Sequence, residues 1–243
     1  MVEIEEQTGA QLLVQCLQNL GVKNSFGVPG ESYLAVLDAL HDADIKFTLC
    51  RQEGSASFAA CAWGKLTGTP GICFVTREPG ATNGSIGVHS ARQDSSPMIL
   101  FVGQVNVDHK DREAFQEVDY RAFFGPLAKW ATEIDNVKRI PEIVSRAWRC
   151  ALSGRPGPVV IGLPEDMLTN RTSVEPCQPI EVAEAGVDLS QTDALTRILN
   201  LTSFLSISNS QSKTREQRVV WNSGCCGTLD VVINQANVSA RLY

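Results

Sequence analysis

The segments Arg51-Gln52-Glu53 and Thr76-Arg77-Glu78-Pro79-Gly80-Ala81-Thr82-Asn83 decide the interpretation of this chain. Each follows a β-branched or apolar run, residues 45–50 and 72–75, that is typical of a strand. Each is also followed by a segment that predicts a helix. The first helix, expected at 53–66, is rich in Ala, Ser and Cys, so it can lie close to a neighbouring backbone. The sequence therefore predicts two successive strand-to-helix junctions.

Strands and helices alternate in the same way on either side of these junctions. The sequence predicts further helices at 8–20, 32–41, 80–92 and 140–152, and further strands at 24–26, 97–102 and 159–163. Continuous apolar runs of this kind are typical of strands that are buried on both faces. Alternation of this kind predicts right-handed βαβ crossovers. We therefore expect an α/β fold with a doubly wound, mainly parallel sheet and helices on both faces.

The segments with unusual residues all follow predicted strands. They are Gly27-Val28-Pro29-Gly30 and residues 51–53, 76–83 and 103–104. Ligands bind beyond the carboxyl ends of the strands in such sheets, so these segments should gather along one edge. By itself, the first segment is either a turn or a place where a ligand approaches the backbone. Glu53 is either an acid favoured by the helix dipole or a carboxylate that hydrogen-bonds a ring nitrogen.

Composition restricts the partners of this chain and the compartment in which we expect it. The 243 residues carry a formal charge of −6 with a pI near 5.2, which argues against a polyanion as the main partner. No basic run suggests nucleic-acid binding or a membrane anchor, and no apolar run is long enough to span a bilayer. The acidic N-terminus has no signal-peptide pattern, so we expect a cytoplasmic protein. The eight cysteines lack the spacing of a zinc site, and we predict no metal site in this chain.

Taken together, the motifs resemble the pyrimidine-binding domain of the thiamine-diphosphate-dependent enzymes, most closely those of the acetolactate synthase group. The resemblance covers roughly residues 7–168 and includes residues 93–98 and Ala114-Phe115-Gln116-Glu117. It implies the thiamine-diphosphate-binding fold and a pyrimidine-binding domain at 1–168. It also implies decarboxylation of a 2-keto acid such as pyruvate, followed by carboligation, as in branched-chain amino acid biosynthesis.

The resemblance also implies roles for individual residues. Glu53 would hydrogen-bond the aminopyrimidine N1′ and so activate the cofactor, and Gln116 would reach the cofactor and substrate from the long loop at 104–124. The residues implied to line the cofactor are Val28, Pro29, Gly30, Glu53, Thr76, Pro79 and Asn83. His89 is a further candidate because some members of the family place an active-site histidine nearby, although a solvated or packed histidine is the commoner situation.

In this family the cofactor is shared between domains. The resemblance implies that a second domain holds the diphosphate through Mg2+, bound by a Gly-Asp-Gly motif, but this sequence contains no Asp-Gly pair. We therefore expect the metal to bind outside this chain, and the chain to be inactive alone. The implied partner is another copy of the chain or a chain that carries the diphosphate-binding domain. FAD occurs in the family, but its site lies mainly outside this region, so the sequence does not support FAD binding.

Two departures from the family pattern leave alternatives open. Glu78 occupies a position that is usually glycine, where a side chain could crowd the backbone. Residues 169–190 are typical of a linker, and 191–243 indicate a truncated or irregular, poorly ordered start of a central domain. The chain is accordingly a truncated or frame-shifted enzyme, a separate pyrimidine-domain subunit of a heteromeric 2-keto acid decarboxylase, or a non-catalytic remnant that serves as an interaction module.

Overall fold

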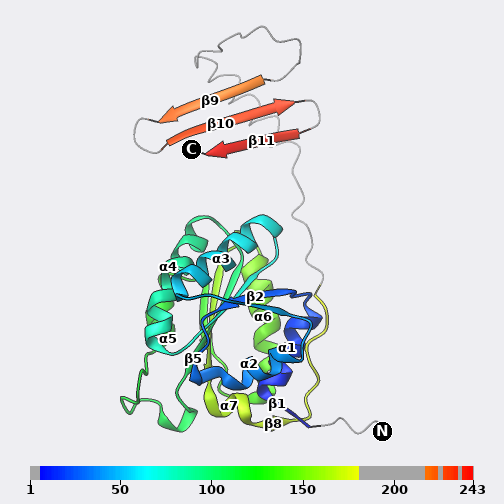
Figure 1. Ribbon diagram of the computed structural model, residues 1–243, viewed down its shortest axis with the longest axis vertical. Helices are drawn as coiled ribbons and strands as arrows, with labels where there is room; N and C mark the ends of the chain where they lie inside the picture. The colour runs from blue at the N-terminus through cyan, green and yellow to red at the C-terminus, as the bar shows by residue number, and fades with distance from the viewer. Residues whose placement is uncertain (1–5, 181–216, 224–226, 235–236, 243) are drawn as a thin grey trace. The chain divides into compact units, whose positions relative to one another are not determined.

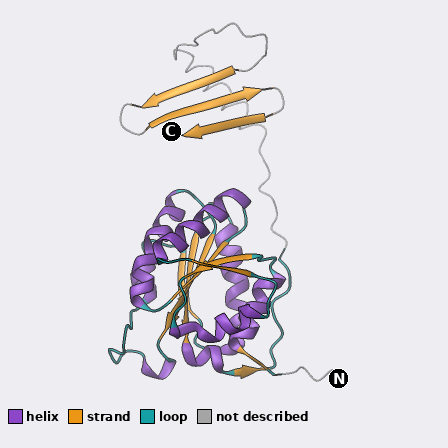
Figure 2. Cartoon of the chain, in the orientation of Figure 1, coloured by secondary structure: helices purple, strands orange, loops and turns teal. Residues whose placement is uncertain are grey.

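The structure, a computed structural model, describes residues 6–180, 217–223, 227–234 and 237–242. The chain divides into two units, Met1–Ala183 and Glu184–Tyr243. Figures 1 and 2 show that the first unit is a central sheet with helices on both of its faces. No helix among the described residues is both long and apolar enough to cross a membrane.

The sheet of the first unit has six strands and is entirely parallel. They are β2 (Asn24–Gly27), β3 (Lys46–Leu49), β4 (Gly71–Val75), β5 (Met98–Gln104), β6 (Trp130–Glu133) and β7 (Pro158–Pro164). Their order is β3-β2-β4-β5-β7-β6, and each neighbouring pair is parallel. The predicted α/β, doubly wound, mainly parallel fold is therefore confirmed. A short antiparallel pair, β1 (Gln7–Thr8) and β8 (Arg171–Thr172), lies outside this sheet.

The order of the strands reverses next to β2. The chain passes from β2 to β3 on one side and then returns across β2 to form β4 on the other. Strand β2 therefore pairs with both β3 and β4, and the crevice between the carboxyl ends of β2 and β4 is a topological switch point. Ligands bind at such points in open α/β sheets. The turn at residues 27–30 and Thr76 follow these two strands.

The helices form one layer on each face of the sheet. They are α1 (Gly9–Asn19), α2 (Leu34–His41), α3 (Glu53–Thr67), α4 (Glu78–Gln93), α5 (Tyr120–Phe124), α6 (Ile140–Leu152) and α7 (Glu165–Thr169), with 3-10 turns η1 (Glu31–Tyr33), η2 (Val107–His109) and η3 (Val137–Arg139). Helices α1, α2, α6 and α7 share a core with Ile72 and Phe74, whereas α3, α4 and α5 share one with Cys73 and Val75. Alternate residues of β4 thus enter opposite cores, which explains its continuous apolar run.

The ends of the helices follow the local signals in the sequence. Thr8 caps α1 in a capping box, in which its Oγ1 accepts from the Gln11 backbone at 3.2 Å and the Gln11 side chain accepts from the Thr8 backbone at 2.9 Å. Gly21 follows this helix with φ of 82°, as expected of a residue that ends a helix. Helix α4 begins at Glu78, two residues before the predicted start, because Pro79 is well suited to a first helical turn.

Some elements were not predicted from the sequence. Strand β6 and helices α5 and α7 are four or five residues long, too short for a periodic pattern to develop. The strands β9 (Gln217–Ser223), β10 (Gly227–Asn234) and β11 (Asn237–Leu242) form an antiparallel sheet of order β11-β10-β9. Most of the segment expected as a linker and irregular domain start, residues 181–216, lies outside the described residues.

Helices α3 and α4 are packed closely through small residues, as the composition of 53–66 predicted. A Cβ atom on Gly87 would lie 2.2 Å from Ser57 Oγ and 2.6 Å from the Ser57 backbone carbon. Real side chains do not approach so closely, so the glycine is required for the helices to meet. Gly84, on the same helix, has nothing nearer than 3.6 Å to such an atom. The two glycines therefore differ in packing but share a helical backbone.

We expect Gly87→Ala to lower the free energy of unfolding by about 1–3 kcal/mol, because the added methyl group forces α3 and α4 apart. The matched variant Gly84→Ala should leave stability unchanged or raise it by up to about 1 kcal/mol, since alanine is the better helix former. Urea denaturation followed by circular dichroism measures both. Equal midpoints for the two variants would contradict the close packing described above.

Candidate functional site

The turn after β2 lies directly across the ends of β4 and β5. A Cβ atom on Gly30 would be 2.5 Å from Thr76 Cβ, and one on Gly103 would be 1.9 Å from Ser32 Oγ. Ser32 is fully buried, and its hydroxyl hydrogen-bonds that of Thr76 at 2.9 Å. Glycine at positions 30 and 103 therefore allows the chain to cross the switch point in contact with the sheet.

Tyr33 holds this turn in place through its hydroxyl group and its ring. Its hydroxyl group donates a hydrogen bond to the Val28 carbonyl oxygen, and its ring stacks on Phe74 with centroids 6.1 Å apart. Burial raises the pKa of Tyr33, with the charges of Cys73 and Glu53 as smaller causes, so the hydroxyl remains a donor.

Glu53 is the first residue of α3 and is half-buried. The preceding residue, Gln52, caps the helix by accepting a hydrogen bond from Ser55 N at 2.9 Å. Asn83 Nδ2, from α4, donates to Glu53 Oε2 at 3.0 Å. No other described residue donates to this carboxylate, so one oxygen atom is held in place while the other can accept a hydrogen bond from a ligand.

Gln116 lies against the start of α4. Its carbonyl oxygen accepts a hydrogen bond from Glu78 N at 3.4 Å, and its φ of 62° is uncommon for a residue with a side chain. Its Oε1 is buried and has no hydrogen-bond partner among the described residues. An unpaired buried acceptor is unfavourable, so this oxygen is suited to a donor group supplied from outside the unit.

Glu78 turns along its own helix. Its Oε1 accepts a hydrogen bond from Thr82 Oγ1 at 2.7 Å, one helical turn further on. No hydrogen bond joins Glu78 to Glu53 among the described residues. The Glu53 carboxylate accepts a hydrogen bond from Asn83 instead. The side chain at position 78 is therefore held along its own helix by Thr82.

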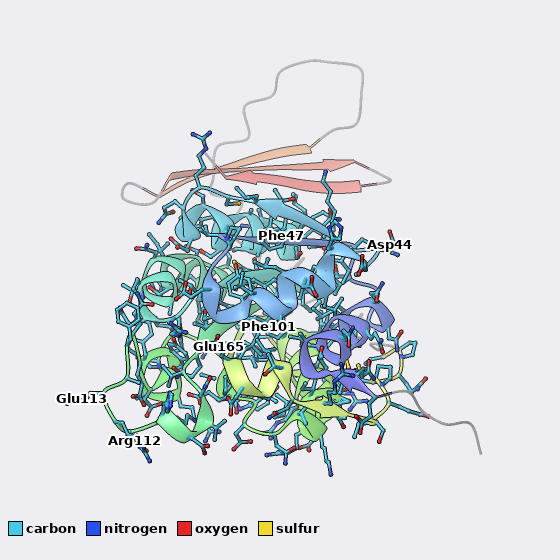
Figure 3. All side chains as sticks on the ribbon, turned by 60° about the horizontal axis from the view of Figure 1, so that its bottom comes forward. Asp44, Phe47, Phe101, Arg112, Glu113 and Glu165 are labelled. Atoms are coloured by element: carbon cyan, nitrogen blue, oxygen red, sulfur yellow. The ribbon has the colours of Figure 1, made fainter. Side chains whose placement is uncertain are left out.

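The loop between β5 and α5 is organised by buried and charged groups. Gln104 is 1% exposed, and its amide nitrogen donates to Val118 O at 2.9 Å and to Glu133 Oε1 at 3.2 Å. Lys110 forms an ion pair with Glu133, which is itself 6% exposed. Figure 3 shows Arg112 and Glu113 at the tip of this loop, projecting away from the sheet.

Glu117 shapes the part of the loop that precedes it. Its carboxylate accepts hydrogen bonds from Asp111 N at 2.6 Å and from Ala114 N at 2.9 Å. These bonds, the one from Ala114 first, lower the pKa of Glu117 below its ordinary value of 4.5. The ionised carboxylate therefore holds the loop that carries Gln116.

Arg77 links three loops at the carboxyl edge of the sheet, a role that the sequence analysis missed. Its side chain is only 12% exposed and binds Glu31 and Glu165, each at 3.0 Å. Glu31 follows the turn after β2, and Glu165 begins α7 after β7, where Figure 3 labels it. The sequence did contain a signal for this link: Glu31 and Glu165 each follow a predicted strand, and Arg77 follows a third.

The expected site residues form three local groups. Glu53 contacts Asn83, Gly30 contacts Thr76 beside Val28 and Pro29, and Gln116 contacts the first residue of α4. Pro79 is exposed in the first turn of α4. His89 is also exposed, six positions after Asn83 or about 9 Å along the helix axis. No described contact joins His89 to the other expected residues, and its role stays a prediction.

Comparison with known proteins identifies relatives of this unit. The model of the family described as thiamine pyrophosphate enzyme, N-terminal TPP binding domain, matches residues 7–123. Acetolactate synthase of Bacillus subtilis (strain 168) is 35% identical over 178 residues, which cover 73% of this chain and 31% of that protein. The acetolactate synthase isozyme 2 large subunit of Escherichia coli (strain K12) is 38% identical over 168 residues, 69% of this chain and 31% of the relative.

A third relative has the same extent of similarity. The acetolactate synthase large subunit of Lactococcus lactis subsp. lactis (strain IL1403) is 40% identical over 170 residues, covering 69% of this chain and 30% of the relative. The matched region thus spans less than a third of each of these three proteins. The similarity concerns the α/β unit that contains the site.

We expect Arg77→Gln to lower the free energy of unfolding by about 1–2 kcal/mol, because it removes two ion pairs of an arginine that is 12% exposed, although Glu31 and Glu165 are themselves 60% and 48% exposed. The control is Arg139→Gln, which breaks an ion pair with Glu142 whose side chains are 50% and 59% exposed. Such exposed pairs contribute about 0.2–1 kcal/mol. Urea denaturation compares the two, and an equal loss of stability would show that Arg77 does not link the loops.

Because the pKa of Glu117 is lowered in the folded loop, its stabilising effect is complete above the ordinary value of 4.5 and is lost as the pH falls through the lowered value. Hydrogen exchange measured by mass spectrometry should therefore show stronger protection of residues 110–117 at about pH 6 than at a pH well below the ordinary value of 4.5. Glu117→Gln should show little protection at either pH. Identical exchange of variant and wild type at the higher pH would refute this role.

Proposed function

We propose that this unit, whose residues 7–123 match the N-terminal thiamine pyrophosphate binding domain of the thiamine pyrophosphate enzymes, binds the aminopyrimidine of thiamine diphosphate. In this proposal Glu53 activates the cofactor. The domain is similar to that of acetolactate synthases. The observation that carries the proposal is the Glu53 carboxylate at the strand-to-helix junction, with one oxygen fixed by Asn83 at 3.0 Å.

The residues present fit the aminopyrimidine group. A planar ring approaching the switch point would meet the turn at residues 27–30, whose backbone lies directly against Thr76 because Gly30 has no side chain. Glu53 supplies an acceptor for a protonated ring nitrogen, and the buried Gln116 Oε1 supplies a second acceptor without a partner among the described residues. Both are acceptors, as recognition of ring N–H and amino groups requires.

Glu53 controls a proton in this proposal. Bound thiamine diphosphate would supply the carbanion-stabilising chemistry for decarboxylation of a 2-keto acid such as pyruvate, and for carboligation. Glu53 would hold a proton at the N1′ nitrogen of the pyrimidine and so change which tautomer of the ring is favoured. Asn83 would help to hold the carboxylate in one orientation, because its amide nitrogen donates to Glu53 Oε2. Thr76, Val28, Pro29 and Pro79 shape the surface around the ring.

The remaining half of the active site lies elsewhere in the proposal. A partner domain, in another copy or another chain, would hold the diphosphate through Mg2+, and the complete assembly would act as an acetolactate synthase-like oligomer in branched-chain amino acid biosynthesis. The unit described here would contribute the activating carboxylate and would be inactive alone. In the same proposal the assembly is cytoplasmic, and FAD is a possible cofactor that this chain does not support.

A complementation assay tests the role of Glu53. An acetolactate synthase deprived of its N-terminal domain is mixed with this chain, thiamine diphosphate, Mg2+ and pyruvate, and acetolactate formation is measured. Wild type should restore activity, and Glu53→Gln should lower kcat by about 100-fold or more, because the amide cannot take up the proton. Binding of the cofactor, measured by calorimetry, should change much less.

Asp44→Asn is the matched control, since Asp44 lies just before β3 and Glu53 lies just beyond its carboxyl end. Asp44 is exposed and pairs only with Lys23, at 2.7 Å, so the control should retain full activity. Restored activity that is unchanged by Glu53→Gln would reject a catalytic role for Glu53 and favour a non-catalytic remnant of the domain.

A further inference from the structure

A second polar hollow lies beside β6, the edge strand of the sheet. It has a volume of about 400 Å3 and is lined by the residues of β6 together with Arg121 from α5, Arg139 from η3 and Arg146 from α6. Strands β5 and β7 separate β6 from the switch point between β2 and β4. The hollow is therefore distinct from the site proposed for thiamine diphosphate.

Contacts within the protein hold each of the three guanidinium groups at this hollow. Arg146 stacks on the Trp130 ring, with its guanidinium carbon 4.4 Å from the ring centroid, a cation–π contact. Arg121 Nη2 donates to Thr132 Oγ1 at 3.4 Å. Arg139 binds Glu142 through two nitrogens, at 3.0 and 3.2 Å. The arginines come from three separate elements, so their convergence is produced by the fold.

The hollow carries a net positive charge although the chain as a whole is acidic, because three arginines and one carboxylate line it. Glu133 lines it as well, but this buried carboxylate is already paired with Lys110. Glu142 neutralises one arginine through an exposed pair, and exposed pairs are weak. Arg121 and Arg146 are left without a carboxylate partner among the described residues. Arg139 lies next to them, and an anion that binds it more tightly than Glu142 could displace that carboxylate.

We propose that this hollow is a binding site for a small anion that carries a phosphoryl group. Guanidinium groups present fixed pairs of N–H donors that match phosphate oxygens, and a set of three suits a polyvalent anion. The volume of about 400 Å3 lies within the usual range for small-ligand sites. The buried Ile143 and the Trp130 ring form an apolar wall, which would lower the local dielectric and strengthen these hydrogen bonds.

Calorimetric titration of the full chain with sodium pyrophosphate at low ionic strength tests the proposal. Each of the variants Arg121→Ala and Arg146→Ala should raise Kd about tenfold or more, because each removes charge-assisted hydrogen bonds. The control is Arg149→Ala, on the same helix three residues after Arg146 but not lining the hollow, and it should change Kd by less than about twofold. Circular dichroism verifies that each variant is folded.

A gain of affinity provides a test that misfolding cannot imitate. Glu142→Gln should release Arg139 and lower Kd by about twofold to fivefold. An equal effect of Arg149→Ala and Arg146→Ala would overturn the site, because binding would then follow the overall charge. The absence of a gain with Glu142→Gln would also overturn it, because Arg139 would then take no part in binding. Binding of citrate as tightly as pyrophosphate would overturn the assignment of a phosphoryl group.

Discussion

The close approach of the turn after β2 to the ends of β4 and β5 is the constraint on which the site depends. Position 30 has no room for a side chain because Thr76 lies against its backbone, and position 103 has none because Ser32 does. The hydrogen bond between Ser32 and Thr76 then ties the turn to the junction at which α4 begins. A single crossing of the switch point thus places two loops that are distant in sequence within reach of the same ligand.

The same geometry holds Glu53, the carboxylate proposed to activate the cofactor, in a half-buried position. Its backbone is fixed because Cys50 N donates to Gly27 O at 2.8 Å, which joins the end of β3 to the turn after β2. Its side chain is fixed by Asn83, and α3 and α4 are held together by contacts that require glycine at position 87. Orientation of the carboxylate is therefore a property of two packed helices, and a rigid surround is what a group that transfers a proton needs.

Local patterns predicted the sheet and the placement of Glu53, Thr76 and the turn at 27–30, because strand ends in a parallel sheet share an edge. They did not predict β6, which has only four residues, or the strands between 217 and 242, whose continuous apolar runs are no longer than three residues. The link through Arg77 was also missed, since its partners are 46 and 88 residues away and only the fold brings them together. Contacts of that range leave no periodic signal in a single sequence.

The loop at 105–119 shows how such distant contacts bear on the chemistry. Gln116 has a strained backbone and a buried oxygen without a partner, which are both unfavourable in isolation. The loop keeps this arrangement because the Glu117 carboxylate accepts a hydrogen bond from the backbone of the loop. In addition, Gln104 and Lys110 both bind Glu133 and so hold the loop to β6. A residue kept in an unfavourable state by its surroundings is already positioned before any ligand binds, so a donor group that reached the Gln116 Oε1 would relieve the cost of the missing hydrogen bond.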